Sequence, residues 1–199
     1  MAIIEHPATS ATDKKVGATS LGSELCTQCG LCCTGALHKS AVLDPDEIVH
    51  AKALGLPVLD REKPGFALPC PRLQGTSCSI YADRPRVCSR YKCQLLQDVE
   101  AGAIDICEAL GKVRIAKELR REVEEAMPSG MTLPQARDMA NSALAAQAEG
   151  SDVSEGDLQL ALRSTALNRY LDKHFRNSRD GRAFDVMNVE RRTGDPEQG

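Results

Sequence analysis

Apolar residues recur every three to four positions over much of the second half of the chain, which is the period of an amphipathic helix. Capping residues and helix breakers divide this part into four expected helices. They run from Gln94 to Ala101, from Asp105 to about Ala126, from Thr132 to about Ala148, and from Ser154 to roughly Phe175. In the last helix the residues expected in the core are Leu158, Leu160, Ala161, Leu167, Leu171 and Phe175.

The first half lacks such a period and is broken by prolines and glycines. Its one clear helix start is Asp-Pro-Asp-Glu at 44–47, where Asp44 can cap free N–H groups and the proline fits the first helical position. Gly55 is expected to end this helix. The apolar residues 41–43 predict a short extended segment, and residues 57–74 predict an irregular loop with room for a short hairpin.

The composition limits the classes of function open to the chain. Its formal net charge of −3 gives no global basic surface, so we expect no nucleic-acid partner. No stretch of about twenty apolar residues and no secretory signal are visible, so we expect no membrane partner and a cytoplasmic location. Aromatic residues make up only 3% of the 199 residues, so we expect a bound metal to support a fold with few large apolar anchors.

Four cysteines fall within the eight residues 26–33, Cys-Thr-Gln-Cys-Gly-Leu-Cys-Cys. Two overlapping C-x-x-C steps share Cys29, and two intervening residues let a tight turn direct both sulfurs and the backbone N–H groups toward one ion. Gly30 lies where such a turn often needs a positive φ. A bridge between the adjacent Cys32 and Cys33 would be strained, so ligation of a metal is favoured over disulfides.

A second group of cysteines follows in a proline-rich segment, where we expect loops braced by ligation. The ninth cysteine, Cys107, lies in an expected helix and is predicted to be a small core residue. His38 is the only histidine close to the cysteines in sequence, but the thiolates already suffice as ligands. The eight candidate metal ligands are Cys26, Cys29, Cys32, Cys33, Cys70, Cys78, Cys88 and Cys93.

Four basic residues surround the last two of these cysteines, namely Arg84, Arg86, Arg90 and Lys92. One interpretation is that they compensate the negative charge of a thiolate site and favour the thiolate form. Another is a docking patch for an acidic partner, and the simplest is an ordinary solvated loop face.

The order of these cysteines resembles that of the CxxCxxCC cysteine-cluster proteins, a family of zinc- or iron-chelating domains. The resemblance covers residues 26–93 and the helix–glycine–helix that follows, and it implies metal binding. One departure is Tyr91-Lys92, where the family often has an aromatic residue followed by proline. Related motifs occur within flagellin lysine methylases. The shared residues are Cys26, Cys29, Gly30, Cys32, Cys33, Cys70, Pro71, Leu73, Cys78, Ile80, Tyr81, Asp83, Arg84, Pro85, Cys88, Arg90 and Cys93.

The residues leave the metal open between an iron–sulfur cluster and zinc. Four thiolates suit a tetrahedral zinc ion, and thiolates equally suit iron–sulfur clusters. The C-x2-C-x2-C start is similar to the ferredoxin run and favours a cluster of the 4Fe-4S type. Eight thiolates have room for two separate ions, for one cluster with spare thiols, or for a shared dinuclear site.

These features predict a mainly α protein, in which a cysteine-rich, loop-dominated module stapled by metal precedes an α-helical region. The expected division is a disordered tail over residues 1–22, a metal-binding domain over 23–93, a helical region over 94–176 and a flexible tail over 177–199.

Three functions compete for such a chain. The first is a redox or cluster-carrying protein, and the second is a structural or metal-handling zinc module within an interaction protein. The third, which rests only on the resemblance, is an enzyme for metal-assisted methyl or thiol transfer. No phosphate-binding loop, nucleophile elbow or metalloprotease motif occurs, so the sequence assigns no catalytic residue, does not decide whether the protein is an enzyme, and identifies no protein partner.

Overall fold

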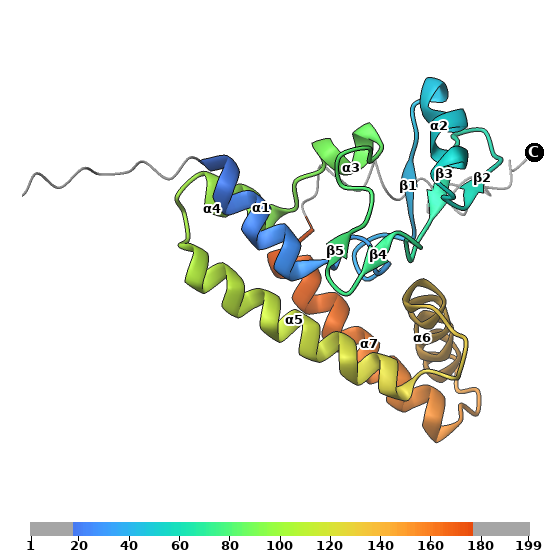
Figure 1. The fold of residues 1–199 in the computed structure, drawn as a ribbon. Helices are drawn as coiled ribbons and strands as arrows, with labels where there is room; N and C mark the ends of the chain where they lie inside the picture. Colours follow the sequence, from blue (N-terminus) through green and yellow to red (C-terminus); the bar gives the residue numbers. More distant parts are fainter. Residues whose placement is uncertain (1–17, 177–199) are drawn as a thin grey trace, which may run out of the picture.

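The computed structural model describes residues 18–176, and most of both expected tails, at 1–17 and 177–199, lies outside the described residues. Within that part the fold is mainly helical, with seven α-helices and only short strands, which confirms the predicted fold class. Figure 1 shows the strands and a short helix gathered at one end, while the long helices form the other. The cysteine segment joins these two parts.

The first helix, α1 (Ala18–Cys29), is an element that the sequence analysis did not predict. It begins within the stretch expected to be a disordered tail and includes the first two cysteines of the cysteine run. Leu25 is 2% exposed, because it packs into the main core together with Leu31 and Leu37 of the turns that follow. Tertiary packing of one apolar side therefore supports this helix, which no sustained apolar period in the sequence predicts.

A small antiparallel sheet follows, in the order β1-β3-β2, from β1 (Ser40–Val42), β2 (Val58–Leu59) and β3 (Gly65–Ala67). Phe66 of β3 lies opposite Ala41 on one side and Val58 on the other, and it is 2% exposed. The extended segment expected at residues 41–43 is thus largely confirmed, while the loop expected at 57–74 also contains two strands of this sheet.

The helix predicted at residue 44 is confirmed as a 3-10 turn, η1 (Pro45–Glu47), that leads into α2 (Ile48–Ala53). Gly55 ends it with a φ of +68°, as expected. Asp44 occupies the capping position, but its side chain makes no capping hydrogen bond. Its carboxylate instead accepts a hydrogen bond from Arg86 at 2.9 Å, because that cation lies within reach on a later helix.

Two short elements carry the later cysteines of the module. The hairpin of β4 (Leu73–Gln74) and β5 (Ser77–Cys78) places Leu73 opposite Cys78. Helix α3 (Arg86–Arg90) follows and has Cys88 at its centre. These elements are too short to be stable alone, so their positions depend on packing and on contacts with neighbouring segments.

The four helices predicted in the second half are confirmed. They are α4 (Gln94–Glu100), α5 (Ile106–Ala126), α6 (Leu133–Ala148) and α7 (Glu155–His174). The caps explain the agreement: Asp105 and Ser154 each accept a backbone N–H, and Thr132 forms a reciprocal capping box with Gln135. In Figure 1, α5 and α7 lie side by side, with α6 packed beside α7.

One main core joins the cysteine segment to the helices. Leu25, Leu31 and Leu37 belong to the same buried cluster as Leu171 and Phe175 of the last helix and its end. A second, smaller cluster lies beneath the sheet, with Ala41, Leu43, Ala51, Leu56, Phe66 and Leu68 as its buried members. The cysteine-bearing segments lie between these two cores. Within residues 18–176, no helix is both long enough and apolar enough to cross a membrane.

Candidate metal centre

A single cavity of about 360 Å³ brings together all eight of the cysteines that the sequence singled out. Its other walls are largely apolar and come from both cores, including Leu37, Phe66, Leu95 and Phe175. None of the nine cysteines forms a disulfide. The lining cysteines are Cys26, Cys29, Cys32, Cys33, Cys70, Cys78, Cys88 and Cys93.

Helix α1 positions the first two thiols of the cavity. Cys26 and Cys29 lie three residues apart on its last turn, so they share one face of the helix. The tight turn expected between them is wrong: the turn comes after Cys29, where the N–H of Gly30 bonds the carbonyl of Cys26 at 3.2 Å. The C-x-x-C spacing fits a helical turn as well as a tight turn, and the packing of α1 decides between them.

Gly30 then reverses the chain toward Cys32 and Cys33. Its φ of +68° confirms the predicted left-handed conformation. A Cβ at this position would meet the Cα of Thr76 at 3.1 Å, so the residue also allows the end of α1 to lie close to the β4–β5 hairpin. The N–H of Cys33 bonds the Gly30 carbonyl at 3.0 Å and closes the turn.

Backbone hydrogen bonds place the later cysteines against this turn. The N–H of Cys70 donates to the carbonyl of Cys33 at 2.7 Å, and the N–H of Leu73 donates to the carbonyl of Cys70 at 3.1 Å. Cys78 lies opposite Leu73 in the hairpin, and Cys88 is the central residue of α3. Cysteines separated by up to 67 positions in the chain therefore line one cavity, Cys26 and Cys93 being the farthest apart.

The end of the last helix closes the cavity on one side, which the sequence analysis missed. Phe175 is fully buried and lines the cavity, and its carbonyl accepts the N–H of Gln94 at 2.9 Å. Arg176 donates to the carbonyls of Ala36 at 2.7 Å and Leu37 at 3.0 Å. Because these residues lie about 140 positions apart in sequence, no local signal could have linked them.

Burial raises the pKa of most of these thiols well above the ordinary value of 9.0. It raises the pKa of Cys29 to about 11, and that of Cys33, Cys88 and Cys93 to about 12. Cys32 is shifted upward most strongly, because burial is joined there by repulsion from neighbouring thiols. Without a bound cation these sulfurs are neutral at physiological pH, and a soft metal ion supplies the charge that makes the thiolates stable.

Hydrogen bonds from backbone N–H groups lower the pKa of three of the thiols and so oppose the effect of burial. The sequence predicted such bonds for the cysteine run that contains Cys29. The N–H of Leu31 bonds the sulfur of Cys29, and the N–H groups of Leu95 and Leu96 bond that of Cys93. Arg72 and Leu73 do the same for Cys70. Each bond stabilises the thiolate, and hydrogen bonds to sulfur are a known means of tuning metal–thiolate centres.

Of the four basic residues near the later cysteines, Arg84 and Lys92 line the cavity. The guanidinium of Arg84 lies 3.8 Å from the centre of the Tyr81 ring, and its charge lowers the pKa of Cys26 and Cys88 against the larger effect of burial. Lys92 instead pairs with Glu100 at 2.8 Å. Charge compensation of the thiols is therefore found at Arg84.

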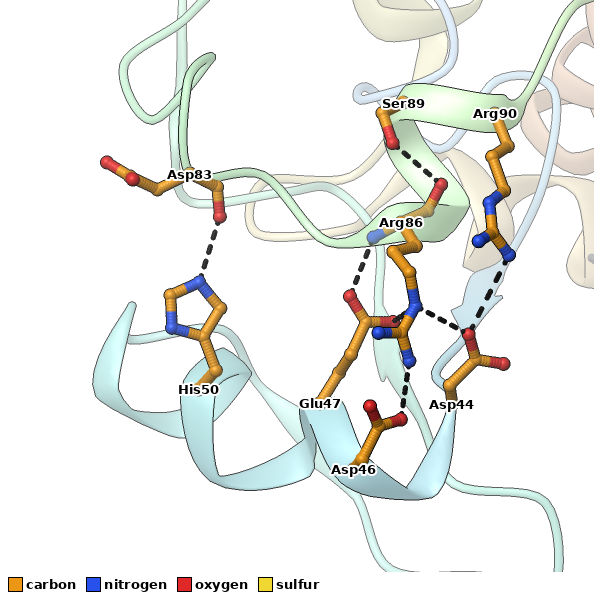
Figure 2. A network of polar contacts seen from close by, with 8 residues as sticks. All are labelled: Asp44, Asp46, Glu47, His50, Asp83, Arg86, Ser89 and Arg90. Atoms are coloured by element: carbon orange, nitrogen blue, oxygen red, sulfur yellow. Dashed lines mark hydrogen bonds and ion pairs between the residues drawn. The ribbon is translucent and has the colours of Figure 1, made fainter.

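Arg86 and Arg90 serve a different purpose, because carboxylates of η1 face them. Figure 2 shows Arg86 beside Asp44, Asp46 and Glu47. Its side-chain Nε lies 2.9 Å from the Asp44 carboxylate, and its backbone N–H donates to the buried Glu47 carboxylate at 2.8 Å. Arg90 reaches Asp44 at 4.0 Å. This network fixes α3, and hence Cys88, on η1.

His38 and Cys107 lie outside the cavity lining. His38 is buried, its Nε2 lies 2.9 Å from the Tyr91 hydroxyl, and burial, aided by nearby arginines, lowers its pKa to about 3. It is thus a neutral hydrogen-bonding residue beneath the site. The prediction that Cys107 is a core residue is wrong: Cys107 is exposed, because α5 turns Ala109 and Val113 toward the core.

The donor set fits a thiophilic metal group. Eight free thiols, one apolar cavity and N–H groups directed at sulfur are what zinc or an iron–sulfur cluster requires. Among residues 18–176, however, no three His, Cys, Asp or Glu side chains already form a ligand set around a single ion. The thiols surround a space that is larger than one ion needs.

Fold and cavity together define a helical protein with a cysteine-lined site for soft metals. Residues 25–110 match the family model CxxCxxCC, described as "Putative zinc- or iron-chelating domain". The resemblance seen in the sequence is thus confirmed, and it supports metal binding by the cysteines. The match includes all eight cavity cysteines and ends within α5, so α6 and α7 lie beyond it. No curated protein and no solved structure matches the chain.

Proposed function

We propose that this protein binds an iron–sulfur cluster through its cavity cysteines and acts in electron transfer or as a carrier of the cluster. The observation that carries the proposal is the convergence of eight reduced thiols on one largely apolar cavity of about 360 Å³. A cluster bound there supplies one-electron redox chemistry or transferable iron and sulfide. The ligands would come from Cys26, Cys29, Cys32, Cys33, Cys70, Cys78, Cys88 and Cys93.

The spacing of the thiols favours a cluster over a lone zinc ion. Four sulfurs bound to one zinc ion each lie about 2.3 Å from it, so they lie within about 3.8 Å of one another. Iron and sulfide atoms between the thiolates of a cluster hold its ligands farther apart. Among the described residues no three candidate ligands are gathered tightly enough for one ion, although eight thiols line the same cavity.

The chain's own residues set the environment of this site. Leu37, Phe66 and Phe175 exclude water from its walls, which protects reduced sulfur and lowers the local dielectric. The N–H groups at Cys29 and Cys93 withdraw charge from the sulfurs. Arg84 supplies a cation beside Cys26 and Cys88. These features stabilise a negatively charged centre without an added counter-ion.

The test is anaerobic purification followed by analysis of iron, acid-labile sulfide and zinc. We expect brown protein that contains iron and sulfide in similar amounts and absorbs in the visible charge-transfer region. Mössbauer spectroscopy would then assign the cluster type. Colourless protein that contains stoichiometric zinc and no iron, after the same preparation, would contradict the cluster.

A structural zinc module within an interaction protein is the second candidate, and the small size of the second core favours it. That core has six buried apolar members beneath strands of two or three residues, so ligation would supply much of the stability of this region. Zinc removal would then abolish hydrogen-exchange protection across 40–91 while α6 keeps its protection. Unchanged protection after chelation would exclude this function.

We also propose the organisation expected from the sequence, with a metal-binding domain over 23–93 and a helical region over 94–176. The supporting observation is that every cavity cysteine lies within the first range, whereas the capped helices α5, α6 and α7 lie within the second. Phe175 and Arg176 of the second range complete the cavity wall and its support. The reduced state of all nine cysteines supports function in a reducing compartment.

A further inference from the structure

The cavity cysteines pack against two different cores, one on each side. Cys29, Cys32 and Cys93 are partly buried against the main helical core, whereas Cys70 and Cys88 pack against the smaller core beneath the sheet. The contacts of the remaining three cysteines show to which side each belongs.

The first set, which we call the helical group, consists of Cys26, Cys29, Cys32 and Cys93. Cys26 and Cys29 share the last turn of α1, Cys32 follows in the next turn, and Cys93 immediately precedes α4, which packs against α1. After burial, the neighbours that most raise the pKa of Cys32 are Cys93 and then Cys29. Three of these ligands have the C-x2-C-x2-C spacing, and a distant cysteine is the fourth.

The second set, which we call the hairpin group, consists of Cys33, Cys70, Cys78 and Cys88. The N–H of Cys70 bonds the Cys33 carbonyl at 2.7 Å, and Cys78 lies on the hairpin that begins three residues after Cys70. After burial, the largest charge effects on Cys88 come from Cys33, Cys70 and Cys78 in that order. Cys88 therefore lies within reach of the other three thiols of this group.

The adjacent residues Cys32 and Cys33 are where the two groups meet. Cys32 packs on the main core, while Cys33 is bonded through its carbonyl to the segment beside the second core. Leu31, which precedes them, is fully buried, and its carbonyl accepts a hydrogen bond from the hydroxyl of Thr34 at 2.9 Å. These contacts fix the backbone on both sides of the two cysteines. Cys32 therefore lies on the side of the helical group, and Cys33 lies on the side of the hairpin group.

We propose that the cavity holds two separate metal groups, one on the helical group and one on the hairpin group, joined at Cys32 and Cys33. This inference deepens the proposed function and rests on it. The ferredoxin-like spacing of the helical group makes it the site of the iron–sulfur cluster. The hairpin group, with four thiolates drawn from a loop, a hairpin and a short helix, takes a second thiophilic group: another cluster at the present spacing of the thiols, or a zinc ion if they move together around it.

Native mass spectrometry of the anaerobically prepared wild-type chain, with metal and sulfide analysis, counts the bound groups directly. Substitution then assigns them: C93S removes one ligand of the helical group, C88S removes one of the hairpin group, and C107S changes an exposed thiol outside the cavity. We expect two groups in the wild type and in C107S. C93S and C88S should each keep one group, and the group kept should differ between them.

A wild-type mass that corresponds to a single metal group would overturn the division, whatever the variants do. So would variants C93S and C88S that fold, as judged by their helical circular dichroism, and each lose all bound metal. In both cases the proposed metal-binding function would still stand. A wild-type chain that contains no iron and no sulfide would instead contradict the proposed function itself, even if it bound zinc. Zinc in place of a second cluster in C93S would identify the occupant of the hairpin group.

Discussion

The thiols of the cavity have an unusual acid–base character, because burial favours their neutral form. The pKa of Cys33, of Cys88 and of Cys93 is raised from 9.0 to about 12. A metal that binds here must displace protons from sulfurs that hold them tightly. Affinity for zinc or iron therefore rises with pH, and binding by the metal-free protein releases protons into the solution.

The same shift predicts that the metal-free protein loses stability as the pH rises above 9. Between pH 9.0 and about 12 the unfolded chain has released protons that the folded chain still holds at Cys33, Cys88 and Cys93, so ionisation favours unfolding. The loss should be on the order of 1 kcal/mol per thiol and pH unit. Urea unfolding with chelator and reductant at pH 7, 8, 9 and 10 measures it.

Two variants refine this test. C88S removes one raised thiol and should reduce the dependence of stability on pH, whereas C107S, which changes an exposed thiol, should keep the wild-type dependence. A free energy of unfolding that stays constant up to pH 10 in the metal-free wild type would show that the thiols are not buried as described.

Gly30 and Gly111 form a matched pair for testing the turn after α1. Gly30 has a φ of +68°, and a Cβ there would meet the Cα of Thr76 at 3.1 Å; Gly111 lies within α5, where a Cβ would meet nothing within 4 Å. We expect G30A to destabilise the protein by about 1–2 kcal/mol or more and to reduce its metal content. G111A should instead stabilise it by about 0.5–1 kcal/mol.

Thermal or urea unfolding together with metal analysis distinguishes these outcomes. The contrast matters more than either value, because both substitutions add the same methyl group. If G30A binds metal normally and unfolds like the wild type, the close approach of α1 to the β4–β5 hairpin is not needed for the site.

Short secondary structure elements in the first half depend on a few polar contacts for their placement. Helix α3, which carries Cys88, is attached to η1 through Arg86 and the carboxylates shown in Figure 2. Glu47 is the buried member of this network and accepts the backbone N–H of Arg86 at 2.8 Å. Asp46 is exposed and pairs with the side chain of Arg86.

This difference predicts unequal effects of two alanine substitutions. E47A leaves the Arg86 N–H without its acceptor and should lower the free energy of unfolding by about 1–3 kcal/mol. D46A removes an exposed ion pair and should change stability little. Because Cys88 belongs to the hairpin group, E47A should also weaken metal retention there, which competition with a chelator measures. Equal retention in both variants would mean that α3 needs no such anchor.

The elements that the sequence predicted are those that have local sequence signals, such as capping residues at the helix start. Asp105, Thr132 and Ser154 cap the three long helices α5, α6 and α7, and each of these helices begins at the residue after its cap. Helix α1 was not predicted, and Leu25 anchors it in the main core. The strands have two or three residues, and their pairing with distant partners is what defines them.

The number and spacing of the cysteines were enough to select all eight cysteines that line the cavity, because so many free thiols in one chain have few uses other than metal binding. Their supports could not be selected in the same way. Arg84 and Arg86 look alike in sequence, yet Arg84 faces the cavity and Arg86 faces the carboxylates of η1. Only the three-dimensional positions of those carboxylates decide which role each arginine takes.

Considered as a whole, the protein couples the metal module to its last helix through Phe175 and Arg176. The Arg176 guanidinium bonds the carbonyls of Ala36 and Leu37, which follow the cysteine run directly. These bonds join a segment that matches the CxxCxxCC family to a helix that lies beyond the match. The C-terminal helices are therefore a support for the candidate metal centre as well as a separate helical layer.

This coupling predicts that a change far along the chain alters the cysteine site. R176A removes charge-assisted hydrogen bonds to Ala36 and Leu37 and should lower the free energy of unfolding by about 1.5–3 kcal/mol. It should also increase amide exchange across 31–37 and speed metal loss to a chelator. R169A, which changes an exposed arginine on the same helix, should do neither. If R176A lost stability but kept wild-type exchange at 31–37 and wild-type metal retention, α7 would stabilise the helical layer without supporting the metal centre.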